Sequence, residues 1–264
     1  MYPIIIIAGP TCTGKTALAL SVAKKTGSII LPLDQLHLYR YLKEGVGLDL
    51  EALSTVDNYG YNILSPWKVC KPKEYVIWLK RSIKKFVEKQ SIIIEGGCTS
   101  YLKEIINKRK LDPLFSLIKI VALDATTNIS QNSKYIAGLY SINKIKKIIN
   151  ETRTLEELGF IKASGLSFFR KCERLFIHPE HDDPRLAWAL RISARMYLPS
   201  YLALKGKIFL ENAQKWTILN VHEIQNFQKE RVHCLLPSSD VRSAKNYCKI
   251  EQELVDYINN YICE

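Results

Sequence analysis

The stretch from Gly9 to Thr16, Gly-Pro-Thr-Cys-Thr-Gly-Lys-Thr, constrains the fold more than any other part of the chain. It fits the phosphate-binding pattern G-x-x-x-x-G-K-[ST] in full, and it stands between the apolar run Ile4–Ala8 and a segment with helical spacing. Glycines in such a loop let backbone N–H groups converge on phosphate oxygens, and the helix N-terminus adds partial positive charge. The sequence therefore predicts a P-loop between a buried strand and a helix.

The side chains of this loop predict a division of labour. Lys15 supplies a catalytic point charge between phosphates, and the Thr16 hydroxyl is the expected ligand for Mg²⁺. Gly9, Thr13 and Gly14 complete the predicted diphosphate contacts. A chance match to the pattern is disfavoured because the strand before the loop and the helix after it are both present.

The first half of the chain alternates strand and helix patterns, which favours a parallel sheet with helical crossovers. We predict an α/β fold with a P-loop NTPase-like parallel sheet flanked by helices. After Ile4–Ala8, the predicted elements are a helix at Thr16–Lys25, a strand at Ser28–Leu33, a helix at Glu74–Lys89, a strand at Ser91–Ile94, a helix from about Thr99 and a strand at Leu117–Leu123.

The strand rhythm is lost beyond residue 125, so we expect a smaller, mostly helical C-terminal part. The predicted division is a P-loop core at residues 1–124 and a helical, substrate-covering region at residues 125–264 that completes the core. Its expected elements are helices at Ile142–Ile149, Arg185–Ala203 and Ile250–Ile262, and a late strand at Trp216–Val221.

Composition narrows the partners and the compartment. The 264 residues carry 38 Lys and Arg against 26 Asp and Glu, a formal charge of +12, which attracts anions such as nucleotides, diphosphates or RNA. The equally weighted interpretation is a solvated surface, because the basic residues are spread out. The seven cysteines are an odd number without metal-ligand spacing, which favours a cytoplasmic compartment. No stretch approaches the roughly 20 apolar residues that cross a bilayer, so no membrane partner is expected.

Two further segments carry polar groups to the carboxyl ends of predicted strands, where open α/β sheets bind ligands. Asp34 follows the second strand, where its carboxylate could take a proton or bind Mg²⁺, or only cap the next turn. Glu95-Gly-Gly-Cys-Thr-Ser100 ends the third strand. Thr99 and Ser100 offer hydroxyls there, either to a ligand or as caps of their own helix.

His178, His181, Asp182 and Asp183 invite a metal-site interpretation, but their spacing matches no recognised site. A polar loop followed by a helix that Asp183 caps is the favoured interpretation.

The three segments, in the order Gly9–Thr16, Leu33-Asp34 and Glu95–Ser100, resemble the isopentenyltransferase family. That family transfers a dimethylallyl group from its diphosphate to N6 of adenine. The P-loop and the Glu-Gly-Gly-x-Thr-Ser stretch look most like the adenylate, cytokinin-forming branch. The resemblance covers residues 3–48 and 91–103, and is weaker at 183–204.

The resemblance implies a role for each matching residue. The P-loop and Mg²⁺ would hold the diphosphate of the prenyl donor, with Lys144 of a mid-chain helix steadying it. Asp34 would accept the proton of the attacking amine, and Thr11 would hydrogen-bond near the reacting centre. Thr99 and Ser100 would hold the acceptor nucleotide together with Asp34.

Several family positions differ here. A serine is replaced by Val46, and a glutamine near Asp34 by His37. The Asp-Gly-Tyr-Arg signature falls on residues 193–196 without its carboxylate. Tyr261 could serve for the tyrosine of the family's C-terminal Tyr-x-x-His, but no histidine follows it. These departures predict weaker or altered binding of the prenyl donor.

The leading expectation is therefore an AMP (or ADP/ATP) dimethylallyltransferase that uses dimethylallyl diphosphate or a hydroxylated analogue. The nearest rival is a tRNA dimethylallyltransferase, which the +12 charge and the stretch Tyr61-Asn-Ile-Leu-Ser-Pro-Trp67 favour. A small-molecule P-loop kinase and a nucleotide-binding descendant without activity complete the alternatives.

Overall fold

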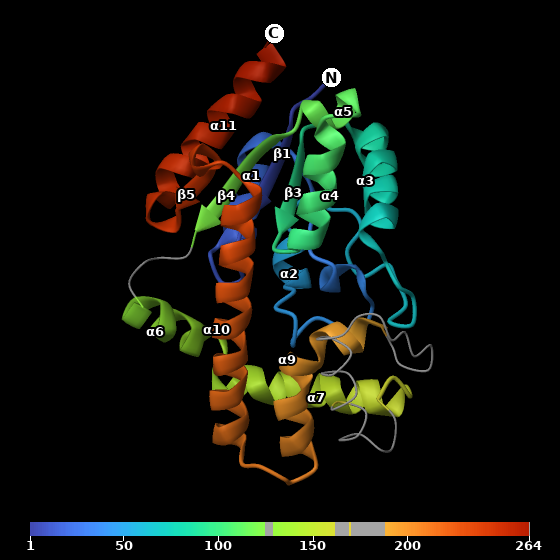
Figure 1. Ribbon diagram of the computed structural model, residues 1–264, viewed down its shortest axis with the longest axis vertical. Coiled ribbons are helices and arrows are strands. Elements are labelled where there is room, and N and C mark those ends of the chain that lie inside the picture. The colour runs from blue at the N-terminus through green and yellow to red at the C-terminus, as the bar shows by residue number, and fades with distance from the viewer. Residues whose placement is uncertain (125–128, 162–168, 170–187, 264) are drawn as a thin grey trace.

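A five-stranded parallel sheet forms the centre of the computed structural model, which describes residues 1–124, 129–161, 169 and 188–263 (Figure 1). The strand order is β2-β3-β1-β4-β5, so the strand before the P-loop is the middle one. The strands are β1 (Ile4–Ala8), β2 (Ile29–Pro32), β3 (Ile92–Gly96), β4 (Lys119–Asp124) and β5 (Val241–Ser243). The predicted fold class is confirmed.

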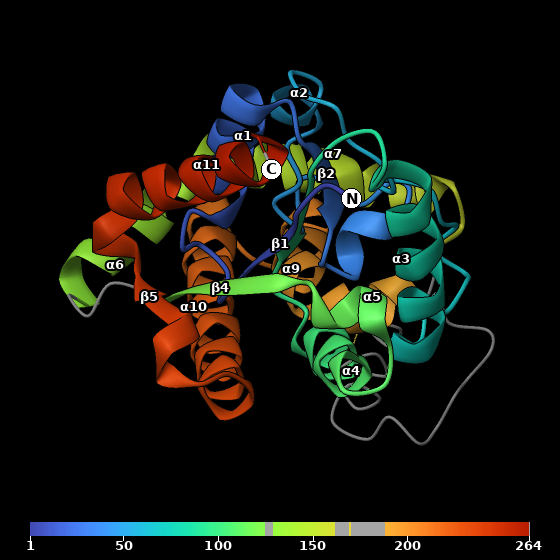
Figure 2. The same cartoon turned by 90° about the horizontal axis from the view of Figure 1, so that it is seen from above.

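Alternating side chains of β1 build two cores, one on each face of the sheet. Ile4 and Ile6 pack with α3 (Pro72–Phe86) and α4 (Thr99–Arg109). Ile5 and Ile7 pack with α1 (Lys15–Thr26) and α11 (Tyr247–Cys263) on the other face (Figure 2). The continuous apolar runs of the sequence are explained by this burial from both sides.

A third core lies among the helices below the sheet, α6 (Ile129–Leu139), α7 (Ile142–Glu157), α9 (Trp188–Leu204) and α10 (Leu210–Leu235) (Figure 1). Helix α10 joins this core to the sheet, because Ala213 and Val221 belong to the helical core whereas Val232 belongs to a core on the sheet. The remaining short elements are α2 (Leu50–Leu53), α5 (Pro113–Ser116), η1 (Leu36–Leu38), η2 (Ser238–Asp240) and η3 (Ala244–Asn246).

The prediction of a late strand at Trp216–Val221 is wrong, because these residues lie inside α10. Thr217 and Val221 are both buried there and stand four residues apart, which puts them on one face of a helix. The late strand is β5, and it joins the sheet beside β4.

Beyond residue 125, β5 and α11 belong to the sheet layer, while α6, α7 and α9 lie below it. The predicted division at residue 124 stays a prediction. His178, His181, Asp182 and Asp183 lie outside the described residues.

Within the part of the chain that the structure describes, no helix combines the length and apolar character needed to span a membrane. The described cysteine thiols, Cys12, Cys70, Cys98, Cys234 and Cys248, are free.

Candidate active site at the P-loop

The P-loop connects β1 to α1 with a backbone that only glycine fits at its two ends. Gly9 has φ +141°, and a Cβ there would stand 2.3 Å from the carbonyl oxygen of Leu123. Gly14 has φ +83° at the N-cap of α1. Within the loop, the Thr13 hydroxyl donates to the carbonyl of Pro10 over 2.9 Å. Gly9 and Thr13 therefore fix the backbone conformation of the loop.

Lys15 lies across this loop and is buried. Its Nζ donates a 2.5 Å hydrogen bond to the Pro10 carbonyl. Burial lowers the pKa of Lys15, and the carboxylates of Glu95 and Asp34 oppose that change. An anion held at the loop would attract this buried ammonium strongly, because charges interact more strongly away from water.

Glu95 ends β3 with a carboxylate that is only 1% exposed. Its Oε2 accepts from the Thr16 hydroxyl over 3.1 Å, and its Oε1 accepts from the Tyr61 hydroxyl over 3.0 Å. A hydroxyl and a carboxylate at this spacing are the oxygen ligands that Mg²⁺ uses in P-loop proteins. Thr16 and Glu95 therefore fit the cation that the sequence predicts.

Asp34 lies just beyond β2, beside the end of β3. A Cβ on Gly96 would stand 2.5 Å from the backbone of Leu33, so this glycine lets the two strand ends approach closely. Asp34 Oδ1 accepts the backbone N–H of Leu36 over 3.0 Å, which is the turn-capping role considered from the sequence. Capping occupies one carboxylate oxygen and leaves the second for a proton.

One cleft of about 690 Å³ collects most of the predicted site residues. Its walls include Thr11, Gly14, Lys15, Thr16, Asp34 and Lys144. Thr99 and Ser100 are not among its lining residues, and neither hydroxyl caps α4. Ser100 Oγ instead lies 3.2 Å from Cys98 Sγ. The structure thus brings four of the predicted diphosphate residues, Gly14, Lys15, Thr16 and Lys144, together with Asp34. Gly9 and Thr13 are not among the lining residues of the cleft either.

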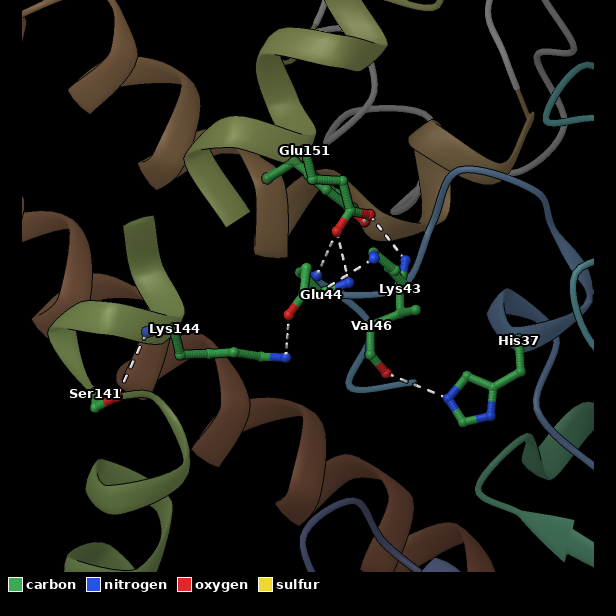
Figure 3. Close-up of polar contacts among 9 residues, drawn as sticks. His37, Lys43, Glu44, Val46, Ser141, Lys144 and Glu151 are labelled. Carbon is green, nitrogen blue, oxygen red and sulfur yellow. Dashed lines mark hydrogen bonds and ion pairs between the residues drawn. The ribbon is translucent and has the colours of Figure 1, made fainter. Parts of the chain in front are cut away.

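Lys144 reaches the cleft from α7 but is already paired. Its Nζ lies 2.7 Å from Glu44 Oε2 (Figure 3). The loop that carries Glu44 is held by Glu151, whose carboxylate accepts the backbone N–H groups of Lys43, Glu44 and Gly45 over 2.8, 2.5 and 3.4 Å. Burial raises the pKa of Glu151, and these hydrogen bonds oppose the rise. Glu151 therefore fixes the cleft wall that faces the P-loop.

Two of the positions that depart from the pattern of the family that the sequence resembles, His37 and Val46, meet in this wall. His37 Nε2 lies 3.3 Å from the carbonyl oxygen of Val46, and both residues line the cleft (Figure 3). His37 is buried, and its Nδ1 has no hydrogen-bond partner among the residues that the structure describes. The pair replaces two polar side chains by an imidazole and an apolar side chain.

Two glutamines of α10 hold the P-loop from the side opposite α1, and the sequence reasoning missed both. Gln228 Oε1 accepts the N–H of Thr11 over 2.7 Å, and its Nε2 donates to the carbonyl of Gly97 over 3.1 Å. Gln225 Nε2 donates to the carbonyl of Thr11 over 2.9 Å. Their spacing of three residues on one helix face is the only signal in the sequence, and it names no partner.

Comparison with known proteins shows which family this chain resembles. The family model described as Isopentenyl transferase matches residues 2–159. A tRNA dimethylallyltransferase of Thermoanaerobacter sp. (strain X514) is 31% identical over 67% of this chain and 59% of its own length. A tRNA dimethylallyltransferase of Thermodesulfovibrio yellowstonii is 28% identical over 44% of each chain. The chain thus spans about half the length of the curated relatives that it matches.

Solved structures share the fold over almost the whole chain. The tRNA isopentenylpyrophosphate transferase of Staphylococcus epidermidis superposes with a TM-score of 0.60 at 16% identity, covering 98% of this chain and 99% of that one. The full-length enzyme of Bacillus halodurans gives 0.57 at 14% identity, covering 99% and 98%. The matched segment contains the P-loop, Asp34 and Glu95, and the chain belongs to the isopentenyl transferase family.

Proposed function

We propose that this protein transfers a dimethylallyl group from dimethylallyl diphosphate to N6 of an adenosine in tRNA. The observation that carries the proposal is the cleft in which a P-loop and the carboxylate of Asp34 share one cavity. A P-loop alone holds phosphate, whereas an adjacent carboxylate adds a base for an attacking amine.

A tRNA acceptor has more support than the expected AMP acceptor. The curated relatives described above are named for action on tRNA, and Thr99 and Ser100, on which the nucleotide site rested, do not line the cleft. The net charge of +12 favours an RNA in the same way, because phosphate contacts supply most of the affinity for nucleic acids.

The chemistry assigns a task to each side of the cleft. The amine nitrogen attacks the allylic carbon that carries the diphosphate, the carbon–oxygen bond breaks, and its electron pair leaves on the diphosphate. Lys15 and the loop N–H groups stabilise the charge that grows on this leaving group. Asp34 accepts the proton that the nitrogen releases. The adenosine therefore approaches from the Asp34 side while the diphosphate lies on the P-loop.

Thr16 and Glu95 are the residues that would hold a Mg²⁺ ion. When bound, the ion would neutralise charge on the diphosphate. The hydroxyl and carboxylate oxygens already meet over 3.1 Å, so the site needs little rearrangement to accept it.

The experiment offers the protein and dimethylallyl diphosphate two acceptors in parallel, AMP and a hairpin RNA with adenosine in its loop. Mass spectrometry then measures the gain of one prenyl group. Product on the RNA alone supports the proposal, and product on AMP alone returns the acceptor to the adenylate expectation.

Two further results would contradict prenyl transfer altogether. Transfer of a labelled γ-phosphate from ATP would make the protein a kinase. Thermal stabilisation by dimethylallyl diphosphate without product on either acceptor would identify a ligand-binding descendant without activity.

A further inference from the structure

A second hollow of about 640 Å³ adjoins the cleft and shares Lys43, Glu44, Leu50 and Lys147 with it. It lies between the loop after η1 and helix α7, with Tyr41 on its wall. Hollows of roughly 300–1,000 Å³ accept ligands of about nucleotide size. A molecule that fills the cleft can therefore continue into this space without leaving the protein.

One exposed aromatic ring, that of Tyr41, lines the hollow, and Trp67, which is not a lining residue, shares its packing partner. Tyr41 is 49% exposed and Trp67 is 44% exposed, although both rings pack on the buried Phe160 at centroid distances of 5.6 and 5.5 Å. The backbone of Tyr41 has φ +66°, a region that non-glycine residues rarely adopt. The Tyr41 ring is therefore open to solvent at the hollow while it packs on Phe160.

Two lysines and two glutamates line the hollow, and both glutamates already have polar partners. Glu44 Oε2 is paired with Lys144 at 2.7 Å, and the Glu151 carboxylate is taken by backbone N–H groups and the Tyr197 hydroxyl. Lys147 is exposed and forms no ion pair with the residues that the structure describes. Lys43 is exposed and forms one long ion pair, with its Nζ 3.8 Å from Glu44 Oε1. Two lysines beside a stacking ring match a phosphate and the base that it carries.

We propose that this hollow holds the nucleotide adjacent to the acceptor adenosine, with its base stacked on Tyr41 and its phosphate at Lys147 and Lys43. The proposal rests on the proposed function, since it requires an RNA acceptor. It adds a subsite that free AMP, having no neighbouring nucleotide, leaves empty. Single-stranded loops are the RNA regions whose bases splay out onto aromatic side chains, so the acceptor adenosine lies in a loop.

The test measures binding of a fluorescently labelled hairpin RNA by anisotropy, with adenosine in its loop. Tyr41→Ala is expected to weaken binding about 5- to 100-fold, the range for loss of one base–aromatic stack. Tyr41→Phe keeps the ring and is expected to keep the affinity. Phe209→Ala is the matched control, because Phe209 is exposed but lines neither hollow nor cleft.

Two hairpins with an abasic site, one on each side of the adenosine, locate the stacked base. With one of them the effect of Tyr41→Ala should vanish, because the base that stacks is missing. An effect that persists with both, or wild-type affinity of Tyr41→Ala for the intact hairpin, would overturn the proposal.

Salt dependence tests the phosphate contact separately. Lys147→Gln should reduce the slope of log affinity against log salt by about one, whereas Lys146→Gln, a neighbouring exposed lysine outside the hollow, should leave it unchanged. Equal slopes for both variants would remove Lys147 from the site.

Failure of the subsite and failure of the proposed function give different results. If the wild-type protein prenylates the hairpin but Tyr41→Ala binds it equally well, only the subsite is wrong. If the hairpin binds through Tyr41 but receives no prenyl group, only the reaction is wrong. Absence of hairpin binding contradicts both.

Discussion

Replacing Gln228 by leucine removes two hydrogen bonds of α10, one to the P-loop and one to Gly97 after β3, while keeping the side chain about the same size. The hydrogen bond from Gln225 to Thr11 stays in place. One of the two lost bonds fixes the N–H of Thr11 at 2.7 Å, and the other reaches the carbonyl of Gly97 at 3.1 Å. A partly buried neutral hydrogen bond contributes about 1 kcal/mol net, so the free energy of unfolding should fall by about 2 kcal/mol. For a chain of this size that corresponds to a melting temperature lower by about 4–8 °C.

The same substitution should also slow the reaction. Thr11 lines the cleft, and its backbone N–H would lose its fixed partner. Since misplacement of a catalytic element by about 1 Å can cost on the order of 100-fold, we expect kcat/KM to fall about 10- to 100-fold. Steady-state prenyl transfer and thermal unfolding monitored by circular dichroism measure the two effects.

The matched control is Glu230→Gln, an exposed position on the same helix that forms no ion pair within the described part of the chain. It should leave both quantities unchanged. A lower melting temperature with wild-type kcat/KM in Gln228→Leu would refute the claim that α10 positions the loop for catalysis. An unchanged melting temperature together with an unchanged kcat/KM would refute the claim that the Gln228 hydrogen bonds matter.

Three further predictions concern the P-loop and the cleft. Because burial lowers the pKa of Lys15 and only the ammonium form binds diphosphate, kcat/KM for the prenyl donor should be full below that pKa and lost as pH rises through it. A pH–rate profile should place this limb below 10.5, the usual pKa of a lysine, and a limb at or above 10.5 would contradict it. Glu44→Gln should release Lys144 for the diphosphate and lower the donor KM severalfold in steady-state assays, whereas an unchanged KM would show that the ion pair does not compete. Gly9→Ala should collide with the Leu123 carbonyl and destabilise the fold by about 1–3 kcal/mol, which chemical denaturation measures, and wild-type stability would disprove the tight approach.

Much of the sheet and the P-loop could be predicted because the sequence patterns that indicate them are local. The apolar run Ile4–Ala8 is continuous because helices cover both faces of β1. The glycines of the next loop indicate where its backbone has positive φ. Asp34 could be placed because the carboxyl ends of parallel strands share one edge. Each of these inferences uses residues only a few positions apart.

The rest of the site depends on contacts between distant segments, which one sequence does not reveal. Gln228 meets Thr11 across 217 positions only because α10 rises from the helical core to the sheet. Tyr61 donates to Glu95 across 34 positions. The sequence therefore predicts that Glu95 lies at a strand end, but it does not reveal its hydrogen-bond partner. The acceptor role of Thr99 rests on the family resemblance and stays a prediction, because position at a sheet edge does not fix which cavity a side chain lines.

The misassigned strand has a similar cause. The run Trp216–Val221 contains β-branched and aromatic residues, which short windows favour as strand. Only the packing of α10 against α9 shows that its buried positions repeat with helical spacing.

The central claim is that Asp34 and the P-loop act together in one cleft to prenylate an adenosine. Single-turnover prenyl transfer to a hairpin RNA, measured by mass spectrometry for the wild-type protein and Asp34→Asn, tests it most directly. The account predicts product with the wild type and a rate about 10²- to 10⁴-fold lower with Asp34→Asn, while binding of dimethylallyl diphosphate stays unchanged. A wild-type rate in Asp34→Asn, or no product from the wild-type protein, would contradict it.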